Sequence, residues 1–239
     1  MRITVINGTE VKGVTYRLKE IFLQELRDKA EITEFYLPRD CPSFCAGCKT
    51  CFLKDEHMCK DAEYIQRIER AMLDADLLVF TTPAYVFHAT GAMKAMLDHL
   101  GYRWMPHRPA EEMFGKRAVI ISQCLGSGAK SAMRDIRDSL SWWGISSIKT
   151  CSFKLMSDVK WDNIPVAKRD KMTAKLRGLS HKCLMTDYGR PAHTGIAVKA
   201  KFLICRMLQT SLGKADPEYT DFKYWRDKGW TGKVRPWKK

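Results

Sequence analysis

The sequence predicts a doubly wound α/β fold, in which helices cover both faces of a parallel sheet. Short β-branched or apolar runs recur along the chain with helical patterns between them, which is the order of βαβ units. The runs are nearly continuous rather than alternating, as expected of parallel strands buried on both faces. Because crossovers between parallel strands are right-handed, the chain should wind its helices onto both sides of the sheet.

The expected elements follow one another along the first two thirds of the chain. Strands are expected at residues 3–6, 32–37, 77–81, 118–122 and 147–153, the last being the weakest pattern. Between them, apolar residues recur at the period of a helix with one buried face, over residues 16–27, 65–72 and 93–100. These elements predict a five-stranded domain over residues 1–153.

From about residue 155 the pattern changes to helices, at residues 167–183 and 197–212, followed by an aromatic and basic tail. We expect residues 154–239 to form a helical C-terminal extension that packs on the domain and at an oligomer interface. Trp225, Trp230 and Trp237 are large apolar surfaces that a soluble monomer should hide. A homodimer or homotetramer is therefore predicted.

Composition narrows the class of protein. A chain of 239 residues with 45% apolar residues can bury one sizeable core, and no stretch approaches the roughly 20 apolar residues of a membrane span. The first residues show no signal-peptide pattern, so a cytoplasmic protein is expected. In such a protein, nine cysteines indicate metal binding, redox chemistry or buried thiols. The net charge of +14 favours anionic partners without choosing among them.

Three loops follow strands at the edge of the sheet where open α/β folds bind ligands. Residues 7–15, Asn-Gly-Thr-Glu-Val-Lys-Gly-Val-Thr, open a helix with glycine and hydroxyl residues, which suits a phosphate. They match neither the dinucleotide fingerprint nor a P-loop. Residues 81–88, Thr-Thr-Pro-Ala-Tyr-Val-Phe-His, supply aromatic side chains, and residues 122–128, Ser-Gln-Cys-Leu-Gly-Ser-Gly, supply glycines that let backbone amides approach a ligand.

A cysteine segment lies between the second strand and the second helix. Cys45, Cys48, Cys51 and Cys59 have the spacing Cys-x2-Cys-x2-Cys-x7-Cys, in which three close thiolates and a fourth can surround one [4Fe-4S] cluster. Three alternatives stay open. The thiols can bind zinc, can be structural and carry no cluster, or, in the case of Cys41 and Cys59, can be redox-active.

Together, the three loops resemble the flavodoxin-like NAD(P)H-dependent FMN reductases, and the cysteine segment resembles their iron-sulfur flavoprotein branch. The resemblance covers residues 1–153, and the ending Tyr224-Trp225 with Gly229-Trp230 is similar to the tail of many members. It implies a sheet of order 2-1-3-4-5. The resemblance also implies that FMN is held by Thr9, Lys12, Gly13, Val14, Thr15, Pro83, Ala84, Tyr85, Val86, Phe87, Cys124, Leu125, Gly126 and Gly128.

The first loop departs from the family pattern, Gly-Ser-Pro-Arg followed by Gly-Asn-Thr. Glu10 and Val11 stand where the family has proline and arginine, and Val14 replaces the asparagine. An acid therefore sits beside the expected phosphate, although Lys12 can offset its charge. Weaker FMN binding is the expected consequence.

The function implied is an FMN-dependent enzyme that passes electrons from NAD(P)H to a quinone, a flavin or another small acceptor, or to a protein carrier. One alternative is an electron-transfer iron-sulfur flavoprotein that receives electrons from ferredoxin without significant NAD(P)H turnover. A second is a basic, zinc-containing nucleic-acid-binding protein, although the sequence has no recognition-helix or zinc-finger pattern. His57 and His88 can relay protons or be ordinary loop residues, and no catalytic residue is assigned.

Overall fold

The computed structural model describes residues 1–156 and 160–238. Its centre is a parallel five-stranded sheet of order β2-β1-β3-β4-β5, which confirms the predicted fold class and strand order. The strands are β1 (Arg2–Asn7), β2 (Glu31–Tyr36), β3 (Leu77–Pro83), β4 (Arg117–Leu125) and β5 (Ser147–Leu155). β3 is buried along its whole length, whereas the edge strand β2 is buried only at Phe35. The continuous apolar runs thus belong to the centre of the sheet.

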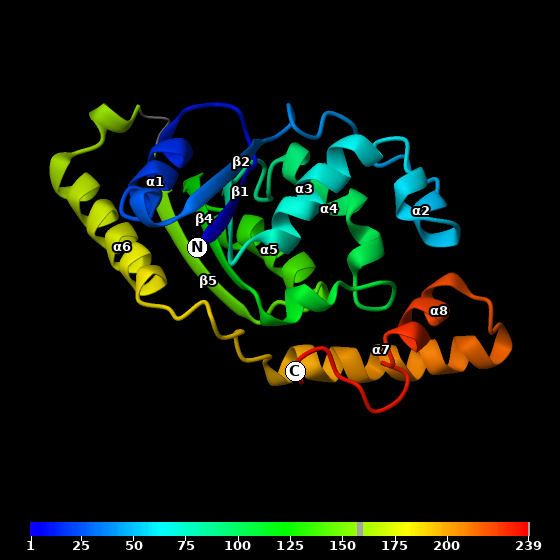
Figure 1. Ribbon diagram of the computed structural model, residues 1–239. Coiled ribbons are helices and arrows are strands. Elements are labelled where there is room, and N and C mark those ends of the chain that lie inside the picture. Colours follow the sequence, from blue (N-terminus) through cyan, green and yellow to red (C-terminus); the bar gives the residue numbers. More distant parts are fainter. Residues whose placement is uncertain (157–159, 239) are drawn as a thin grey trace.

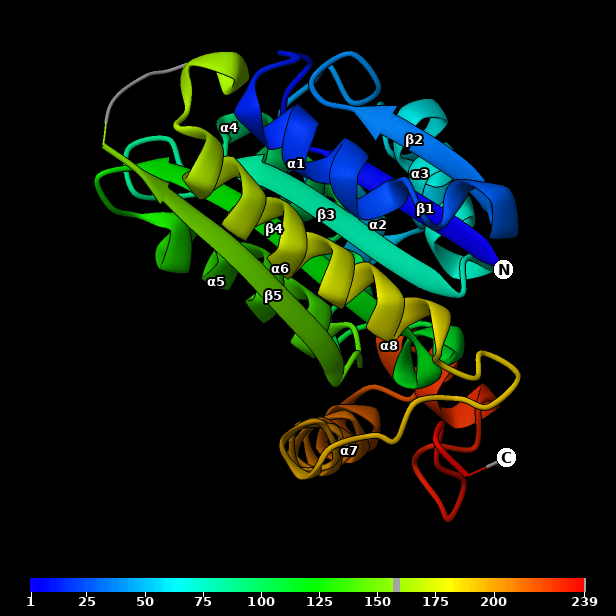
Figure 2. The ribbon, with the colours of Figure 1, turned by 90° about the vertical axis from the view of Figure 1, so that its left-hand side faces the viewer.

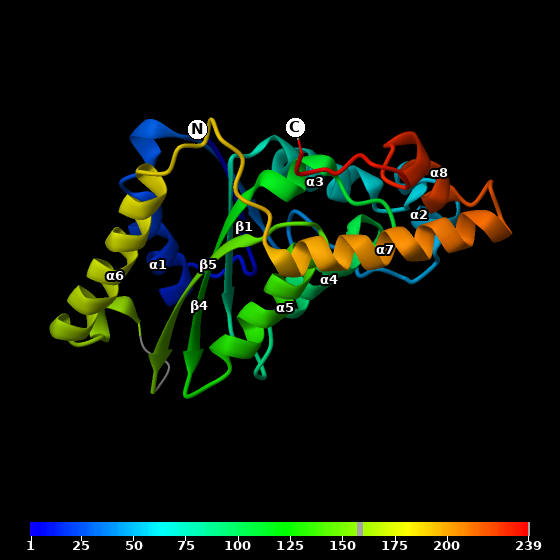
Figure 3. The same ribbon diagram turned by 90° about the horizontal axis from the view of Figure 1, so that it is seen from below.

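Helices cover both faces of the sheet. On one face lie α1 (Val14–Leu23) and α6 (Val166–Leu184), which contact each other (Figure 2). On the other face lie α3 (Ala62–Asp74), α4 (Gly91–His99) and α5 (Ala129–Trp142) (Figure 3). Each helix layer has its own hydrophobic cluster against the sheet. The apolar stripes predicted from the sequence are buried there, as Leu18, Ile68 and Met96 illustrate.

Shorter elements connect these layers. They are α2 (Thr50–Leu53) and the 3-10 turns Arg27–Lys29, Glu56–Met58, Gly101–Arg103, Glu111–Gly115 and Trp161–Asn163. The first helix ends earlier than the pattern of residues 16–27 indicates. Leu26 is nevertheless fully buried, because it lies in the turn before the first 3-10 segment and still reaches the core.

The last two helices, α7 (Ile196–Ala215) and α8 (Thr220–Asp227), lie together beside one end of the sheet domain (Figure 1). Trp225 and Trp230 are buried in a third cluster of this same chain, and Trp237 packs on Phe114 and Phe202. Trp225 and Trp230 are therefore hidden within this chain itself, and the expected oligomer interface stays a prediction. Their burial partners lie far away in sequence, so the sequence pattern could not reveal them.

The C-terminal segment thus has two locations. α6 completes a helical layer of the sheet, while α7 and α8 pack beside it, so residues on both sides of position 153 share one core. The division into a domain and an extension stays a prediction. In the part of the chain that the structure describes, no helix has the length and apolar character needed to cross a membrane.

Candidate active site

A cavity of about 1110 Å3 opens at the carboxyl ends of β1, β3 and β4. The parallel sheet brings the three loops together there, although up to 118 positions separate their residues in the chain. Of the residues predicted to hold FMN, those at the cavity wall are Thr9, Lys12, Gly13, Val14, Thr15, Pro83, Ala84, Tyr85, Val86, Phe87 and Leu125. Among the described residues, Cys124, Gly126 and Gly128 do not line the cavity.

The first loop presents the start of α1 to the cavity. Gly13 is the N-cap of this helix and supplies no side-chain cap, so the first backbone N–H groups have no partner from a capping side chain. Thr15 is buried beside them, and the amide of Val11 donates to the Thr9 hydroxyl at 3.1 Å. Free amides and the positive end of the helix dipole form an anion site. Glu10, the acid in this loop, does not line the cavity.

The second loop ends in a tight turn. Tyr85 and His88 exchange backbone hydrogen bonds of 2.9 and 3.0 Å, and between them Val86 and Phe87 have φ angles of 48° and 67°. Positive φ is rare for a β-branched residue and is found where surrounding structure holds a functional loop. The turn leaves Tyr85 and Phe87 exposed at the cavity wall, so it offers aromatic surface to a ligand.

Hydrogen bonds fix this second loop to the rest of the domain. The Thr90 hydroxyl donates to the Gly8 carbonyl at 2.5 Å and accepts from the Met93 amide, which caps α4. His88 lies 3.1 Å from Asp135, whose carboxylate also accepts from the Ala89 amide. His88 is therefore held against α5 and does not line the cavity.

The third loop contributes in a way that the sequence did not indicate. Cys124 is buried and its thiol is directed at the Phe153 carbonyl, so it packs inside the sheet. Gly128 supports the second loop, because a Cβ at this position would lie 2.9 Å from the Cα of Phe87. Gln123 lines the cavity, and its buried Oε1 has no hydrogen-bond partner among the described residues. A turn of the Gln123 side chain would bring this acceptor to a bound ligand.

Nine cavity residues were not predicted: Val11, Arg17, Gln123, Ser127, Leu155, Lys160, Trp161, Asp162 and Asn163. Arg17 lies one turn into α1, on the side that helical periodicity places beside Gly13. Lys160 to Asn163 follow β5, at the same edge of the sheet. Their sequence pattern places them in the extension, but the rule that ligands bind beyond the carboxyl ends of strands applies to the fifth strand as well.

The cysteine segment lies beyond β2, in a loop before α3. Cys45 and Cys48 are exposed, while Cys51 and Cys59 are half-buried. Gly47 and Lys49 have φ angles of 66° and 60°, so the backbone curls between the cysteines. This conformation is easy for glycine, and the curl connects Cys45 and Cys48 in the loop to Cys51 in α2.

The pKa values of the thiols show which cysteines are neighbours. Burial raises the pKa of Cys51, and the nearby Cys59 and Cys45 raise it further. A hydrogen bond with the Thr50 side chain lowers the pKa of the exposed Cys48. Burial, with Asp61 and Cys59 close by, raises the pKa of Cys41 to about 11, which makes this thiol a poor nucleophile.

Arg108 anchors the cysteine segment to the C-terminal helices. This buried guanidinium donates to the carbonyls of Cys51 and Phe52 and pairs with Asp221 of α8, which is fully buried. His107 lies 2.8 Å from the same carboxylate. The extension therefore helps to position the proposed cluster ligands, a link that sequence separation concealed.

Comparisons with known proteins agree with this geometry. The model of the family described as NADPH-dependent FMN reductase matches residues 1–158. An iron-sulfur flavoprotein of Archaeoglobus fulgidus is 22% identical over 143 residues, which are 59% of this chain and 62% of that protein. An FMN-dependent NADH:quinone oxidoreductase of Alkalilimnicola ehrlichii is 29% identical over 122 residues, 47% of this chain and 59% of that protein. The chain thus spans about three fifths of the length of these curated relatives.

Solved structures support the fold. The FMN-dependent NADH-azoreductase of Bacillus anthracis, solved with FMN, has a TM-score of 0.61 at 12% identity, covering 77% of this chain and 99% of that one. An NADH:FMN oxidoreductase has a TM-score of 0.54 at 17% identity, covering 80% of this chain and 94% of that one. With the family match extending over the whole sheet and its three loops, the chain belongs to the NADPH-dependent FMN reductase family.

Proposed function

We propose that this chain is an FMN-dependent oxidoreductase that passes electrons from NAD(P)H to a quinone, a flavin or a similar small acceptor, or to a protein carrier. The observation that carries the proposal is the cavity of about 1110 Å3 at the carboxyl edge of the sheet, bordered by a helix start without a cap. When bound, FMN supplies the hydride chemistry that protein side chains lack. The residues of this chain would bind FMN, orient it and shield it from water.

The phosphate of FMN is assigned to the start of α1. The amides that follow Gly13 lack a capping side chain, and Thr9 and Thr15 add hydroxyl groups at the cavity wall. Lys12 and Arg17 add positive charge. Because the backbone amides belong to a formed helix, little ordering entropy opposes their binding to the phosphate.

The flavin ring is assigned to the second and third loops. Tyr85 and Phe87 offer an apolar wall, and a turn of the Gln123 side chain would let its unpaired Oε1 accept from a ring N–H group. The cavity exceeds the roughly 300–1000 Å3 of an ordinary small-molecule site, which leaves room for a nicotinamide beside the flavin.

The enzyme proposal is tested by steady-state oxidation of NADH and NADPH with FMN-loaded protein and an added quinone. Turnover that requires both FMN and the acceptor supports it. An electron carrier that receives electrons from ferredoxin is the second candidate, favoured by the likeness to iron-sulfur flavoproteins. That candidate predicts FMN binding and reduction by ferredoxin with no turnover of either nicotinamide. The fold and family favour both over the nucleic-acid alternative.

We further propose that Cys45, Cys48, Cys51 and Cys59 hold one [4Fe-4S] cluster. The donor set fits in kind, because four thiols lie in the loop before α3 and in the short helix α2 within it. Among the described residues no three of these sulfurs lie within 4.8 Å of one another, so the proposal requires the segment to close around the cluster. Thiolates are also the ligands that iron-sulfur centres select over oxygen donors. A cluster here would add single-electron exchange to the flavin.

The cluster is tested by counting iron per chain after anaerobic reconstitution with iron and sulfide. About four irons are expected in the parent and far fewer in Cys48→Ser, since a [4Fe-4S] cluster needs four thiolates. Cys151→Ser is the matched control, because Cys151 is buried in β5 away from the segment. A parent that takes up no iron while it retains FMN would return the cysteines to a structural role.

We also propose that the chain forms a homo-oligomer, with α7 as the contact. Ile196, Ile204 and Met207 of this helix are 84%, 66% and 71% exposed, which is unusual for large apolar residues on one helix face. Sedimentation velocity should show a dimer or tetramer, and Met207→Glu should shift it to monomer. The control is Val166→Glu, on a similarly exposed residue of α6. A monomeric parent at micromolar concentration would contradict the proposal.

A further inference from the structure

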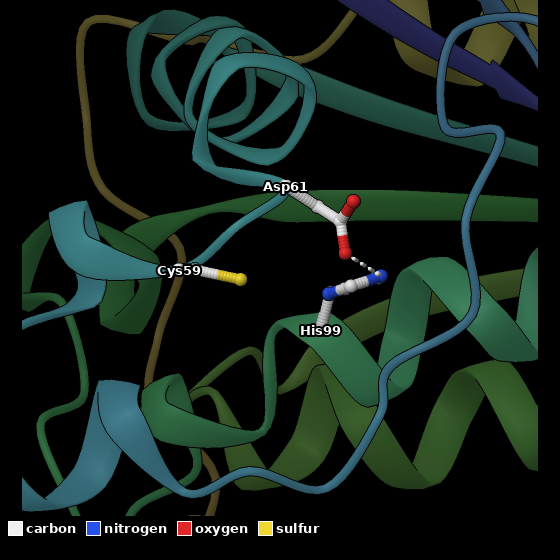
Figure 4. A group of neighbouring side chains, drawn as sticks. All are labelled: Cys59, Asp61 and His99. Atoms are coloured by element: carbon white, nitrogen blue, oxygen red, sulfur yellow. Dashed lines mark ion pairs between the residues drawn. The ribbon is translucent and has the colours of Figure 1, made fainter.

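Three metal-ligating side chains meet between the start of α3 and the end of α4. Cys59, Asp61 and His99 each offer a ligand atom, and these atoms lie within 4.8 Å of one another. Figure 4 shows the sulfur, a carboxylate oxygen and the imidazole ring facing one space. Asp61 and His99 are buried, and Cys59 is half-buried.

Asp61 is the second, independent indication of a ligand. Its side chain is only 9% exposed, and its buried Oδ2 has no hydrogen-bond partner among the described residues. The nearest cationic groups, Lys60 Nζ at 3.8 Å and His99 Nε2 at 3.7 Å, are both beyond hydrogen-bond distance. A buried carboxylate in this condition is costly unless a cation compensates it.

The position of Asp61 makes this arrangement unusual. Asp61 is the N-cap of α3, where aspartate ordinarily accepts a hydrogen bond from an amide of the first turn. Here the side chain makes no cap bond. The carboxylate gives up its local partner and lies toward Cys59 and His99 instead (Figure 4).

The surroundings of His99 match those of a metal ligand. Nε2 lies 3.1 Å from the carbonyl oxygen of Ser43, which fixes the plane of the ring. Metal-binding histidines almost always donate one ring N–H to a carbonyl or carboxylate in this way, which orients the other nitrogen. The ring is 2% exposed, so its orientation is set by the protein and not by solvent.

We propose that Cys59, Asp61 and His99 bind one divalent cation of the zinc type. One thiolate, one imidazole and one carboxylate are a donor set that zinc accepts, at about 2.0–2.3 Å from the metal, so small movements of these side chains close the site. Binding releases the thiol proton of Cys59 to solvent. The fourth position is left to water or to Cys41, which lies beside Asp61 and Cys59.

This site does not rest on the proposed redox function, but it shares Cys59 with the proposed cluster. A single thiolate at this position serves one centre at a time, so iron-sulfur assembly and a divalent cation compete for it. The two sites differ in their other ligands. Cys45, Cys48 and Cys51 belong to the cluster alone, whereas Asp61 and His99 belong to the divalent site alone.

The test uses the full chain with Cys45, Cys48 and Cys51 all replaced by alanine, which removes the rival thiolates and the cluster. Cobalt(II) is titrated anaerobically into this protein, and absorbance reports thiolate-to-cobalt charge transfer and four-coordinate geometry. One cobalt per chain with both signatures is expected, displaced by zinc. No cobalt binding in this protein would overturn the proposal, whatever the iron content of the parent.

Two further variants in the same protein identify the ligands. Asp61→Asn and His99→Gln should each weaken cobalt binding at least tenfold, while His57→Gln, a matched change at an exposed histidine of the same loop, should leave it unchanged. Circular dichroism and FMN binding check that each variant is folded, and if His99→Gln does not fold, Asp61→Asn decides. Cobalt affinity that survives Asp61→Asn would overturn the proposal.

Discussion

Replacing Gly13 with aspartate should weaken FMN binding while leaving the apoprotein at least as stable. The position tolerates a side chain, because an added Cβ would meet only Val11 Cγ1 at 3.8 Å and φ is −89°. A carboxylate at an N-cap accepts from the amides of the first turn. It would therefore occupy the donors proposed for the phosphate and place a negative charge beside it.

The expected loss of affinity can be worked out from one amide-phosphate hydrogen bond. A hydrogen bond to a charged group is worth about 1.5–3 kcal/mol, so losing one corresponds to roughly 10-fold to 150-fold weaker binding at about 1.4 kcal/mol per tenfold. The new cap and the helix dipole should add about 0.5 kcal/mol to the free energy of unfolding of the apoprotein. Affinity and stability are thus expected to move in opposite directions.

Quenching of FMN fluorescence measures the affinity, and thermal unfolding of the apoprotein measures the stability. The matched control is Gly91→Asp, which adds the same carboxylate at the start of α4. A Cβ at Gly91 would meet open space, and Gly91 does not line the cavity. FMN affinity should be unchanged in the control. Equal FMN affinity in Gly13→Asp and the parent would refute the assignment of the phosphate to this loop, though not the fold.

Three further predictions concern stability. Lys19→Met should lower the free energy of unfolding by about 3 kcal/mol in a denaturant titration, because Glu34, which Lys19 pairs with at 2.5 Å, loses its buried partner; an unchanged midpoint would contradict this. Burial tends to raise the pKa values of Glu20 and Asp40, but their hydrogen bonds to basic groups lower them below the ordinary values of 4.5 and 3.8. The stabilisation that these two carboxylates provide is complete above their ordinary pKa values and is lost as pH falls through their lowered pKa values in the folded protein. The melting temperature should therefore stay constant from pH 7 to about 5 and drop below about pH 4; a flat profile down to pH 3 would argue against this prediction. Asp221→Asn should destabilise the chain by about 3 kcal/mol and make the loop of residues 39–60 more sensitive to protease, since Arg108, which holds this loop, keeps Glu56 but loses its fully buried carboxylate partner; unchanged proteolysis would show that the loop does not depend on α8.

Much of the fold could be predicted because its determinants are local. The central strands are continuous apolar runs. In the helices, apolar residues such as Leu18, Phe22 and Ile68 recur at the helical period, so the sequence of each segment indicates which of its faces is buried. Right-handed crossovers then leave few ways to assemble the sheet. The helices expected at residues 167–183 and 197–212 agree closely with Val166–Leu184 and Ile196–Ala215 for the same reason.

The candidate site could be predicted only in part. A loop that follows a strand is placed by the strand, which is why the residues of the first two loops are at the cavity. Within the third loop, side-chain direction depends on neighbours: Cys124 packs into the sheet, and Gly128 supports Phe87. Trp161 and Gln123 were missed because their roles depend on which elements approach the cavity rather than on any local pattern.

The sequence by itself determined the order of strands and helices, the three loops at the carboxyl edge and the family to which the chain belongs. The tertiary structure decided where the last third of the chain packs, so that Trp225 and Trp230 are core residues and Asp221 holds the cysteine segment through Arg108. It also brought His99 to Cys59 and Asp61, across 40 positions of chain. Hydrophobic periodicity encodes which face of an element is buried, but it does not encode the partner, because contacts between distant segments depend on the shape and polarity of surfaces that exist only after folding.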